Sequence, residues 1–245
     1  MTLLVVLALG IGAALVLLGA GGSILTVPLL MYGGGLDVRH AAATSLVVVA
    51  VVAVAATVLQ WQRVRVRTGL MVGAAGAVGT IPGVWLNHRL PEVLLVLGFA
   101  VTLLLVATRL GGGDRTVAAP VTTVGPTLVA GLGAGVATGL FGVGGGFVVV
   151  PVLALLVGLG MREAVATSLF VVALNSLAGV AGHLAYGVID WPMALVVSTA
   201  ALAGGVGARP FARRISGPRL QQAFAASLMA VGLVMLAHAL RQVLV

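Results

Sequence analysis

The sequence predicts an all-α membrane protein, a bundle of about eight to ten membrane segments arranged as two inverted repeats with glycine-broken or re-entrant helices. Three observations predict this fold: scarce charge, long apolar segments interrupted by glycine, and an internal repeat whose copies have opposite charge bias. Of the 245 residues, 61% are hydrophobic and only 7% are charged. A soluble domain carries about 25% charged residues. Most of this surface must therefore face lipid.

The pattern of the apolar residues favours helices over a β-barrel. Barrel strands alternate apolar and polar residues in short segments, and this chain lacks that alternation. Helices are the other structure that satisfies every backbone group in hydrocarbon. Cysteine is absent, which excludes disulfides and thiolate metal sites. The formal charge of +8 comes from 13 arginines at segment ends, a placement typical of membrane anchors, so no nucleic-acid partner is expected.

Eight apolar segments can be placed, and the first is interpreted as a membrane helix and not as a removable signal. The first and fifth exceed the roughly 20 residues of one span, and glycines interrupt both. The segments cover about 3–33, 41–60, 69–87, 92–110, 121–158, 163–184, 191–208 and 220–240.

An internal repeat relates the two halves of the chain at an offset of 123 residues. The stretch Ala43-Thr44-Ser45-Leu46 falls on Ala166-Thr167-Ser168-Leu169, and Pro28 and Arg39 fall on Pro151 and Arg162. We therefore expect an N-terminal transmembrane repeat over 1–110, a cytoplasmic linker over 111–120 and a C-terminal transmembrane repeat over 121–245.

Arginine placement indicates that the repeats are inverted, because cytoplasmic loops are enriched in basic residues. The loop after the second segment holds Arg63, Arg65 and Arg67, whereas the equivalent loop, 185–190, holds none. The loop after the third segment has the opposite bias. It holds one arginine, Arg89, in the first half, and its equivalent in the second half holds four, at positions 209, 213, 214 and 219. Inverted halves require an odd number of crossings each, yet four segments are visible per half. A short half-helix, Ile24 to Tyr32, and its repeat within 121–158 would restore the odd number.

Two glycine clusters are the strongest candidates for a binding site. The first contains Gly21, Gly22 and Ser23, the second Gly144, Gly145 and Gly146, and each precedes a proline by six residues. A helix that begins after such a break directs unpaired N–H groups and its positive dipole end to the break, which suits an anion. Broken helices at matching positions of two halves also mark transporter binding sites. The alternative is close helix packing.

Polar residues in the following segments are further candidates. The pairs Thr44-Ser45 and Thr167-Ser168 match in the repeat. They could cap the helices or donate hydroxyls to an oxyanion. Asn175, with its neighbour Ser176, needs partners inside a span, either a neighbouring helix or the substrate.

The ionisable residues allow interpretations that stay open. Arg39 and Arg162 could anchor helices or attract anions. Residues near segment ends that could relay protons are Asp37, Glu163, Asp190 and His183. The sequence contains none of the common enzyme motifs, so we expect no enzyme, no cofactor and no metal.

The two motifs resemble the signature of the sulfite exporter TauE/SafE family. The second copy runs Gly142-Val-Gly144-Gly145-Gly146-Phe-Val-Val-Val-Pro151, followed by Arg162-Glu-Ala-Val-Ala-Thr-Ser-Leu169. The resemblance implies a secondary transporter in the bacterial plasma membrane for sulfite, sulfoacetate, thiosulfate or related sulfonates. The first copy departs from it at Ser23, where the second has Gly146.

The residues and the resemblance together predict alternating access of a small sulfur-containing anion to a site at mid-membrane. A passive anion channel and a membrane scaffold protein without transport are the alternatives. The sequence leaves open the anion, the direction of transport and the oligomeric state, a homo-oligomer included. Because no nucleotide site is present, an ion gradient must supply the energy, with H⁺ as the candidate coupling ion.

Overall fold

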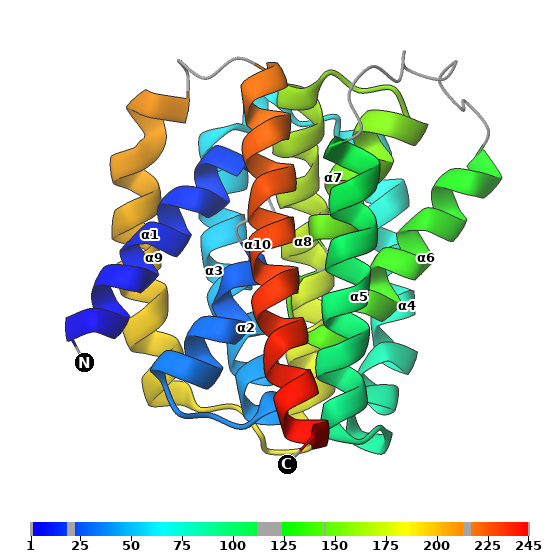
Figure 1. The fold of residues 1–245 in the computed structure, drawn as a ribbon. Helices are drawn as coiled ribbons and strands as arrows, with labels where there is room; N and C mark the ends of the chain where they lie inside the picture. Colours follow the sequence, from blue (N-terminus) through cyan, green and yellow to red (C-terminus); the bar gives the residue numbers. More distant parts are fainter. Residues whose placement is uncertain (1, 19–22, 112–123, 145, 213–216, 245) are drawn as a thin grey trace.

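The computed structural model describes residues 2–18, 23–111, 124–144, 146–212 and 217–244, and the fold over these ranges is entirely helical (Figure 1). The long helices of the first half are α1 (Thr2–Leu18), α3 (Val38–Leu59), α4 (Val66–Arg89) and α5 (Glu92–Gly111). Those of the second half are α6 (Val124–Phe141), α8 (Met161–Leu184), α9 (Trp191–Ala212) and α10 (Gly217–Leu244). The short elements are α2 (Thr26–Pro28), α7 (Gly146–Pro151), the π-helices η2 (Leu29–Gly33) and η4 (Val152–Leu156), and the 3₁₀ turn η3 (Trp61–Arg63).

The predicted fold class, a helical bundle that crosses the membrane many times, is confirmed. Five of the described helices, α3, α4, α5, α8 and α9, are long and apolar enough to span a bilayer. Large apolar side chains also face outward, among them Val58, Ile81, Val129 and Leu195, which are between 67% and 69% exposed. Outward apolar surface on this scale belongs in lipid. The protein is therefore a multi-pass membrane protein.

The two halves run in opposite directions through the bundle. In Figure 1, α3 rises from the lower end while α8 descends from the upper end. Hydrogen bonds at both ends of this pair confirm the direction: the Asp190 N–H donates to Thr44 Oγ1, and the Arg65 N–H donates to Thr167 Oγ1, each at 3.0 Å. Residue 44 lies near the start of α3 and residue 190 lies beyond the end of α8. The helices are therefore antiparallel, as inverted repeats require.

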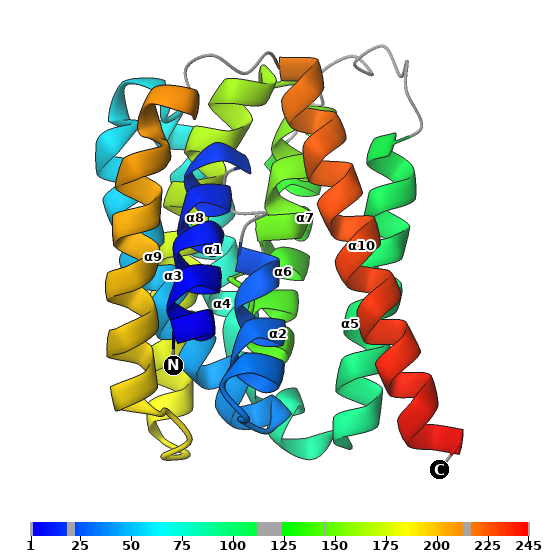
Figure 2. The same cartoon turned by 60° about the vertical axis from the view of Figure 1, so that its left-hand side comes forward.

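The odd number of crossings is restored by the segment that follows each glycine break. In the first half, α1 rises, the α2–η2 segment returns, and α3, α4 and α5 follow in alternating directions (Figure 2). The second half repeats this order upside down, with the α7–η4 segment in place of α2–η2 (Figures 1 and 2). Both chain ends lie at the lower end, whereas α5 ends and α6 begins at the upper end. The predicted half-helix Ile24 to Tyr32 thus corresponds to the α2–η2 segment.

The repeats interlock, because the first helix of each half packs on a helix of the other half. This partner is the fourth element when the short α2–η2 and α7–η4 segments are counted. α1 lies along α9, and α6 lies along α4. Glycine makes this approach close: a Cβ at Gly12 would lie 1.7 Å from the Ala201 carbonyl oxygen, and one at Gly135 would lie 1.9 Å from the Gly76 carbonyl oxygen. Gly12 and Gly135 are equivalent at the repeat offset. Small residues at helix interfaces let backbones touch in this way.

Each half-helix ends in the same motif, which explains why the repeat retains its proline and glycine. Pro28 and Pro151 precede the π-helices η2 and η4, and Gly35 and Gly158 follow them with φ of 71° and 75°. After Gly158, the Leu159 N–H donates to the Leu153 carbonyl at 3.0 Å. In the first half, the Leu36 N–H donates to the Leu30 carbonyl at 3.1 Å. A left-handed residue after a helix favours glycine, which has no Cβ.

This left-handed turn gives a prediction about stability. Gly35→Ala should destabilise the protein by about 1–2 kcal/mol, the cost of a left-handed alanine, since nothing lies within 4 Å of the added Cβ and no clash contributes. The measurement is thermal unfolding in detergent. Gly125→Ala is the control, because that glycine also has free space but keeps an ordinary helical φ. Equal melting temperatures for both variants would contradict the proposed strain.

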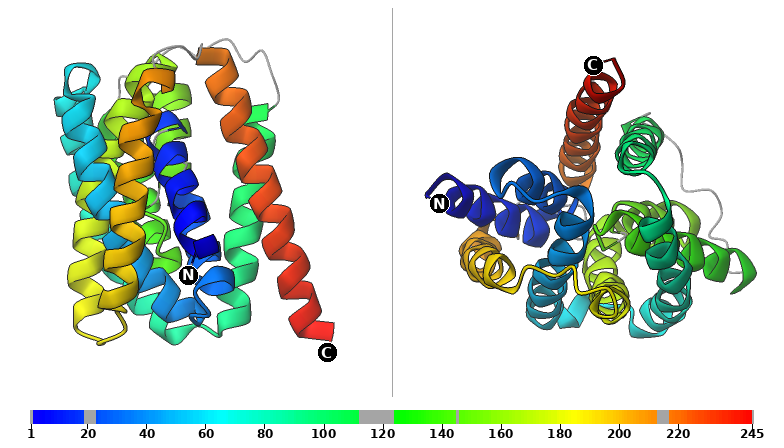
Figure 3. Two further views of the ribbon diagram at one scale, coloured as in Figure 1. Left: turned by 90° about the vertical axis from the view of Figure 1, so that its left-hand side faces the viewer. Right: turned by 90° about the horizontal axis from the view of Figure 1, so that it is seen from below.

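The α5–α10 pair stands beside the other helices. α5 packs mainly on α10, and both make few contacts with the remaining helices. Viewed from below, the pair forms an arm of its own, while α3 and α8 lie within the main group (Figure 3). The molecule therefore has a core around α3 and α8 and a peripheral helix pair.

Candidate functional site

The break between α6 and α7 lies inside the core, pressed against α3. Gly142 and Gly144 have φ of 71° and 68°, a conformation that side chains rarely allow. A Cβ at Gly142 would lie 2.3 Å from the Cα of Ala42, and one at Gly144 would lie 2.8 Å from the Val49 side chain. Glycine is therefore required at both positions. Gly145 lies outside the described residues, as do Gly21 and Gly22 of the first break.

Two serines connect the breaks to each other and to α3. Ser23, which begins the α2–η2 segment, donates its hydroxyl to the Val143 carbonyl in the middle of the second break. Ser45 donates to the Ala42 carbonyl at 3.0 Å and also contacts the Gly142 carbonyl. Both serines are fully buried. The structure thus brings Ser23, Ser45, Gly144 and Gly146 together around the second break.

Buried polar groups without partners border this break. Ser176 on α8 is 0% exposed, its Oγ has no hydrogen-bond partner in the described chain, and it lies 2.9 Å from where a Cβ of Gly144 would be. In the α2–η2 segment, Thr26 is also buried with an unpartnered hydroxyl. An unpaired polar group in an apolar interior is costly. A ligand that accepts hydrogen bonds would satisfy such groups.

Asn175, the neighbour of Ser176, faces α4. It is fully buried, and neither its Oδ1 nor its Nδ2 has a hydrogen-bond partner in the described residues. A Cβ at Gly76 would lie 2.4 Å from Oδ1, so the absent side chain on α4 makes room for the amide. The sequence draws attention to Asn175 and Ser176 together, whose counterparts in the first half are the apolar Val52 and Ala53, but it predicts only Asn175 as a site residue.

Thr44, Thr167 and Ser168 lie away from the break. The two threonines accept N–H groups at the opposite ends of the α3–α8 pair, as described above, and Ser168 donates to the Val165 carbonyl at 2.8 Å. The capping interpretation of these residues is wrong. The residues that precede α3 and α8 are Asp37 and Gly160, so the Thr-Ser pairs lie in the second turn of each helix. The two threonine hydroxyls hold the ends of the antiparallel helices together, whereas Ser168 bonds within its own helix. The role of these residues toward an anion stays a prediction.

Asp37 is the N-cap of α3 and lies at the lower end. Its carboxylate accepts the N–H groups of Arg39 and His40 at 3.0 and 2.9 Å and contacts the His40 ring at 2.7 Å. Partial burial raises the pKa of Asp37, but these hydrogen bonds and the charge of His40 outweigh it, so the pKa lies below its ordinary value. Asp37 is therefore an ionised cap, and its proton-relay interpretation gains no support. Glu163, at the upper end, pairs with Arg65 at 2.6 Å.

A small apolar cavity lies at the end of α6, between the core and the α5–α10 pair. Phe141, which ends α6, packs against Phe99 of α5 with ring centroids 5.3 Å apart. The cavity lining is Val27, Met31, Val38, Leu95, Val96, Phe99, Leu140, Phe141 and Met235. The cavity therefore offers an apolar surface next to the end of α6.

The chain is similar to bacterial membrane proteins over most of its length. Residues 4–235 match the family model described as sulfite exporter TauE/SafE. A probable membrane transporter protein of Xylella fastidiosa (strain 9a5c) is 30% identical over 206 residues, 80% of this chain and 78% of that protein. A second one, from strain Temecula1, is 29% identical over 91% of this chain and 90% of its own length. The probable membrane transporter protein YunE of Bacillus subtilis is 27% identical, covering 83% and 85%.

None of the solved structures matches the chain significantly. The family match covers nearly the whole sequence, including both glycine breaks and both Thr-Ser pairs. The relatives named above are each described as probable membrane transporters. On these grounds the chain belongs to the sulfite exporter TauE/SafE family of membrane transporters.

Proposed function

We propose that this protein is a secondary transporter that moves a small sulfur-containing anion, such as sulfite, thiosulfate, sulfoacetate or a related sulfonate, by alternating access. The observation that carries the proposal is the buried, unpartnered Ser176 hydroxyl beside the left-handed Gly144 of the second break. Because the Ser176 hydroxyl has no partner in the described chain, it can donate to an oxyanion without first breaking another hydrogen bond. The α7–η4 segment begins at the same break and adds backbone N–H groups.

The donors proposed for the anion are neutral. They are the hydroxyls of Ser23, Ser45 and Ser176 and the Asn175 amide, together with backbone N–H groups after the break. Neutral donors replace the water shell of an anion without the large desolvation cost of a buried arginine. They also hold the anion weakly enough for release, which transport requires. The substrate is therefore expected to be small and rich in acceptor oxygens.

Opening the proposed site requires that contacts at the break separate. Ser23 and Ser45 bind carbonyls of Val143 and Gly142, so both hydroxyls are occupied when the helices are packed as described. An arriving anion would compete for the same hydroxyls and free the carbonyls. The sparse contacts of the α5–α10 pair make it the element that would move relative to the core. Inverted repeats then allow the same movement toward either side of the membrane.

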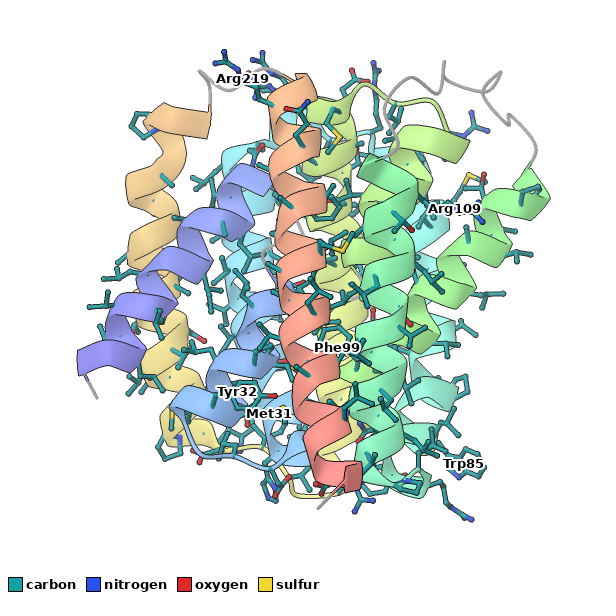
Figure 4. The ribbon with its side chains drawn as sticks, viewed as in Figure 1. Met31, Tyr32, Trp85, Phe99, Arg109 and Arg219 are labelled. Atoms are coloured by element: carbon teal, nitrogen blue, oxygen red, sulfur yellow. The ribbon has the colours of Figure 1, made fainter. Side chains whose placement is uncertain are left out.

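The charge distribution supports an orientation in the bacterial plasma membrane. Arg109 and Arg219 lie at the upper end (Figure 4), where Arg65 pairs with Glu163. By the positive-inside rule the upper end faces the cytoplasm, and the two termini face outward. Export is the direction named by the family description.

A passive anion channel and a scaffold protein are the alternative functions, and a flux assay distinguishes all three. Purified protein in liposomes is tested with sulfite, thiosulfate, sulfate and a sulfonate, with and without a proton gradient. A transporter gives saturable flux and counterflow. A channel gives flux that rises linearly with concentration, and a scaffold gives no protein-dependent flux.

Ser176→Ala tests the binding role of the hydroxyl. Losing one hydrogen bond worth about 1 kcal/mol should weaken anion binding by roughly fivefold, seen as a raised KM for flux, while stability stays the same or rises. Ser227→Ala on α10 is the control, since Ser227 donates only to the Phe224 carbonyl in its own helix. An unchanged KM in a well-folded Ser176→Ala variant would contradict the site.

A further inference from the structure

Two histidines, the partly exposed His88 and the buried His183, form a pair at the lower end of α4 and α8. The Nε2 atom of His88 lies 3.3 Å from the Nδ1 atom of His183. His183 is 0% exposed, and the His88 ring stacks on Tyr186 with centroids 3.7 Å apart. Both rings are therefore held by neighbours on two helices. The anion site proposed above uses neither ring, and the sequence leaves a proton-relay role of His183 open.

The pair lies close to the second break. The His183 ring borders the backbone of Gly139, and Asn87, beside His88, donates to the Leu140 carbonyl at 2.7 Å. Both α6 residues lie within the last turn before the break. Along α8, His183 lies seven residues after Ser176, so both are on one face, about 10 Å apart along the helix axis. A change of charge on the pair would be felt at the proposed anion site.

The pair can bind one extra proton without losing its hydrogen bond. In the neutral state one ring donates and the other accepts across the 3.3 Å contact. When His183 donates through Nδ1, its Nε2 lone pair is free, and that atom has no partner of hydrogen-bond geometry in the described chain. A proton there gives an imidazolium that still donates to His88, a charge-assisted bond.

The surroundings offer the protonated pair no counter-ion. Arg39 of α3 acts on His88 as a like charge, and Tyr186 contacts His88 through its stacked ring. Asp190, before α9, accepts the Met193 N–H at 2.9 Å, and Arg89 lies over the Trp85 ring. No carboxylate in the described ranges is hydrogen-bonded to either imidazole.

An anion at Ser176 would supply the missing charge. At about 10 Å and an effective dielectric constant near 20, its attraction favours protonation of the pair by about tenfold. By linkage, the proton favours anion binding by the same factor. Proton and anion would therefore bind together.

Among the residues that the structure describes, the upper end has no equivalent of this histidine pair. At the repeat offset His183 corresponds to Gln60, and Gly139 corresponds to Val16. Gln60 Nε2 lies 3.5 Å from the Val16 carbonyl, so the amide takes the place of the imidazole at the upper end. An amide does not titrate. The position of His88 is occupied by Phe211 in the second half.

From these contacts we propose that the His88–His183 pair is a proton-binding site that couples anion movement to the proton gradient. The pair loads a proton at the lower end when the anion is present and releases it when the anion leaves. This inference rests on the proposed anion transport. The inference adds to that function the identity of the coupling ion and the two residues that bind it.

The test separates coupling from transport, using purified protein in liposomes and radiolabelled thiosulfate. Exchange is measured at equal pH on both sides, and accumulation is measured under a pH gradient with the membrane potential clamped by K⁺ and valinomycin. His183→Gln copies the residue that the other repeat carries, and His88→Gln is a second variant. His40→Gln is the matched control, because His40 is partly exposed and bound to Asp37.

The wild type and His40→Gln should accumulate thiosulfate about tenfold for a gradient of about one pH unit, as one proton per anion requires. His183→Gln and His88→Gln should exchange at a rate within about twofold of the wild type and fail to accumulate. Accumulation by both pair variants, or wild-type exchange without any pH-driven accumulation, would overturn the coupling site and leave the transport function intact. Loss of exchange in folded pair variants would also overturn it, by showing a role in translocation itself. Wild-type liposomes without exchange of thiosulfate, sulfite, sulfate or a sulfonate would instead refute the proposed function.

Discussion

Replacing Gly135 by alanine should separate α6 from α4 and destabilise the protein by about 3 kcal/mol, the upper range for overpacking. The added Cβ would lie 1.9 Å from the Gly76 carbonyl oxygen. Backbone lies on both sides of this contact, so no side chain can turn away to make room. The helices must move apart, and their packing along the whole interface is lost. We expect the melting temperature in detergent to fall by roughly 10 °C.

Gly133→Ala on the same helix is the matched control. Gly133 is exposed and has no atom within 4 Å of an added Cβ, so alanine there should be neutral or slightly stabilising. Gly12→Ala, the equivalent change in the other half, should behave like Gly135→Ala, since its Cβ would lie 1.7 Å from the Ala201 carbonyl oxygen. Equal stability of Gly133→Ala and Gly135→Ala would show that α4 and α6 do not pack through these glycines.

Asn175→Leu should stabilise the protein and at the same time reduce transport by at least about tenfold. Leucine has the branched shape of asparagine, so it fits the space that Gly76 leaves. It removes an amide whose two polar atoms are buried without partners, and such a group costs about 1–3 kcal/mol. If the amide contacts the anion during transport, its loss removes two potential hydrogen bonds. The measurements are thermal unfolding and the rate of radiolabelled anion exchange.

A gain in stability with a loss of transport is the result expected of a functional residue. Thr57→Val is the control, because the Thr57 hydroxyl is buried but already bonded to the Ala53 carbonyl at 2.7 Å in its own helix. Removing that hydroxyl should leave transport unchanged. Normal exchange by a stabilised Asn175→Leu variant would show that the amide belongs to the α4–α8 contact alone.

The sequence indicated local backbone features and missed features that depend on distant partners. It located the second glycine break, where Gly142 and Gly144 are left-handed, because glycines and a following proline are properties of a few adjacent residues. Anion binding at this break stays a prediction. The hydroxyls of Thr44 and Thr167 looked equivalent to those of Ser23 and Ser45, yet they bond to loops at the ends of the bundle. Which acceptor a hydroxyl meets is decided by helices far away in the chain.

The amino-acid sequence by itself determined the membrane environment, the helical fold, the inverted repeats and the position of the second break. These features follow from apolar length, charge bias and backbone chemistry, all of which can be read along the chain. The tertiary structure alone decided that Ser23 meets the second break, that Ser176 remains unpartnered beside Gly144, and that His88 meets His183. Those contacts join residues separated by up to 120 positions. Their geometry is set by how antiparallel helices pack through glycine, which no local pattern specifies.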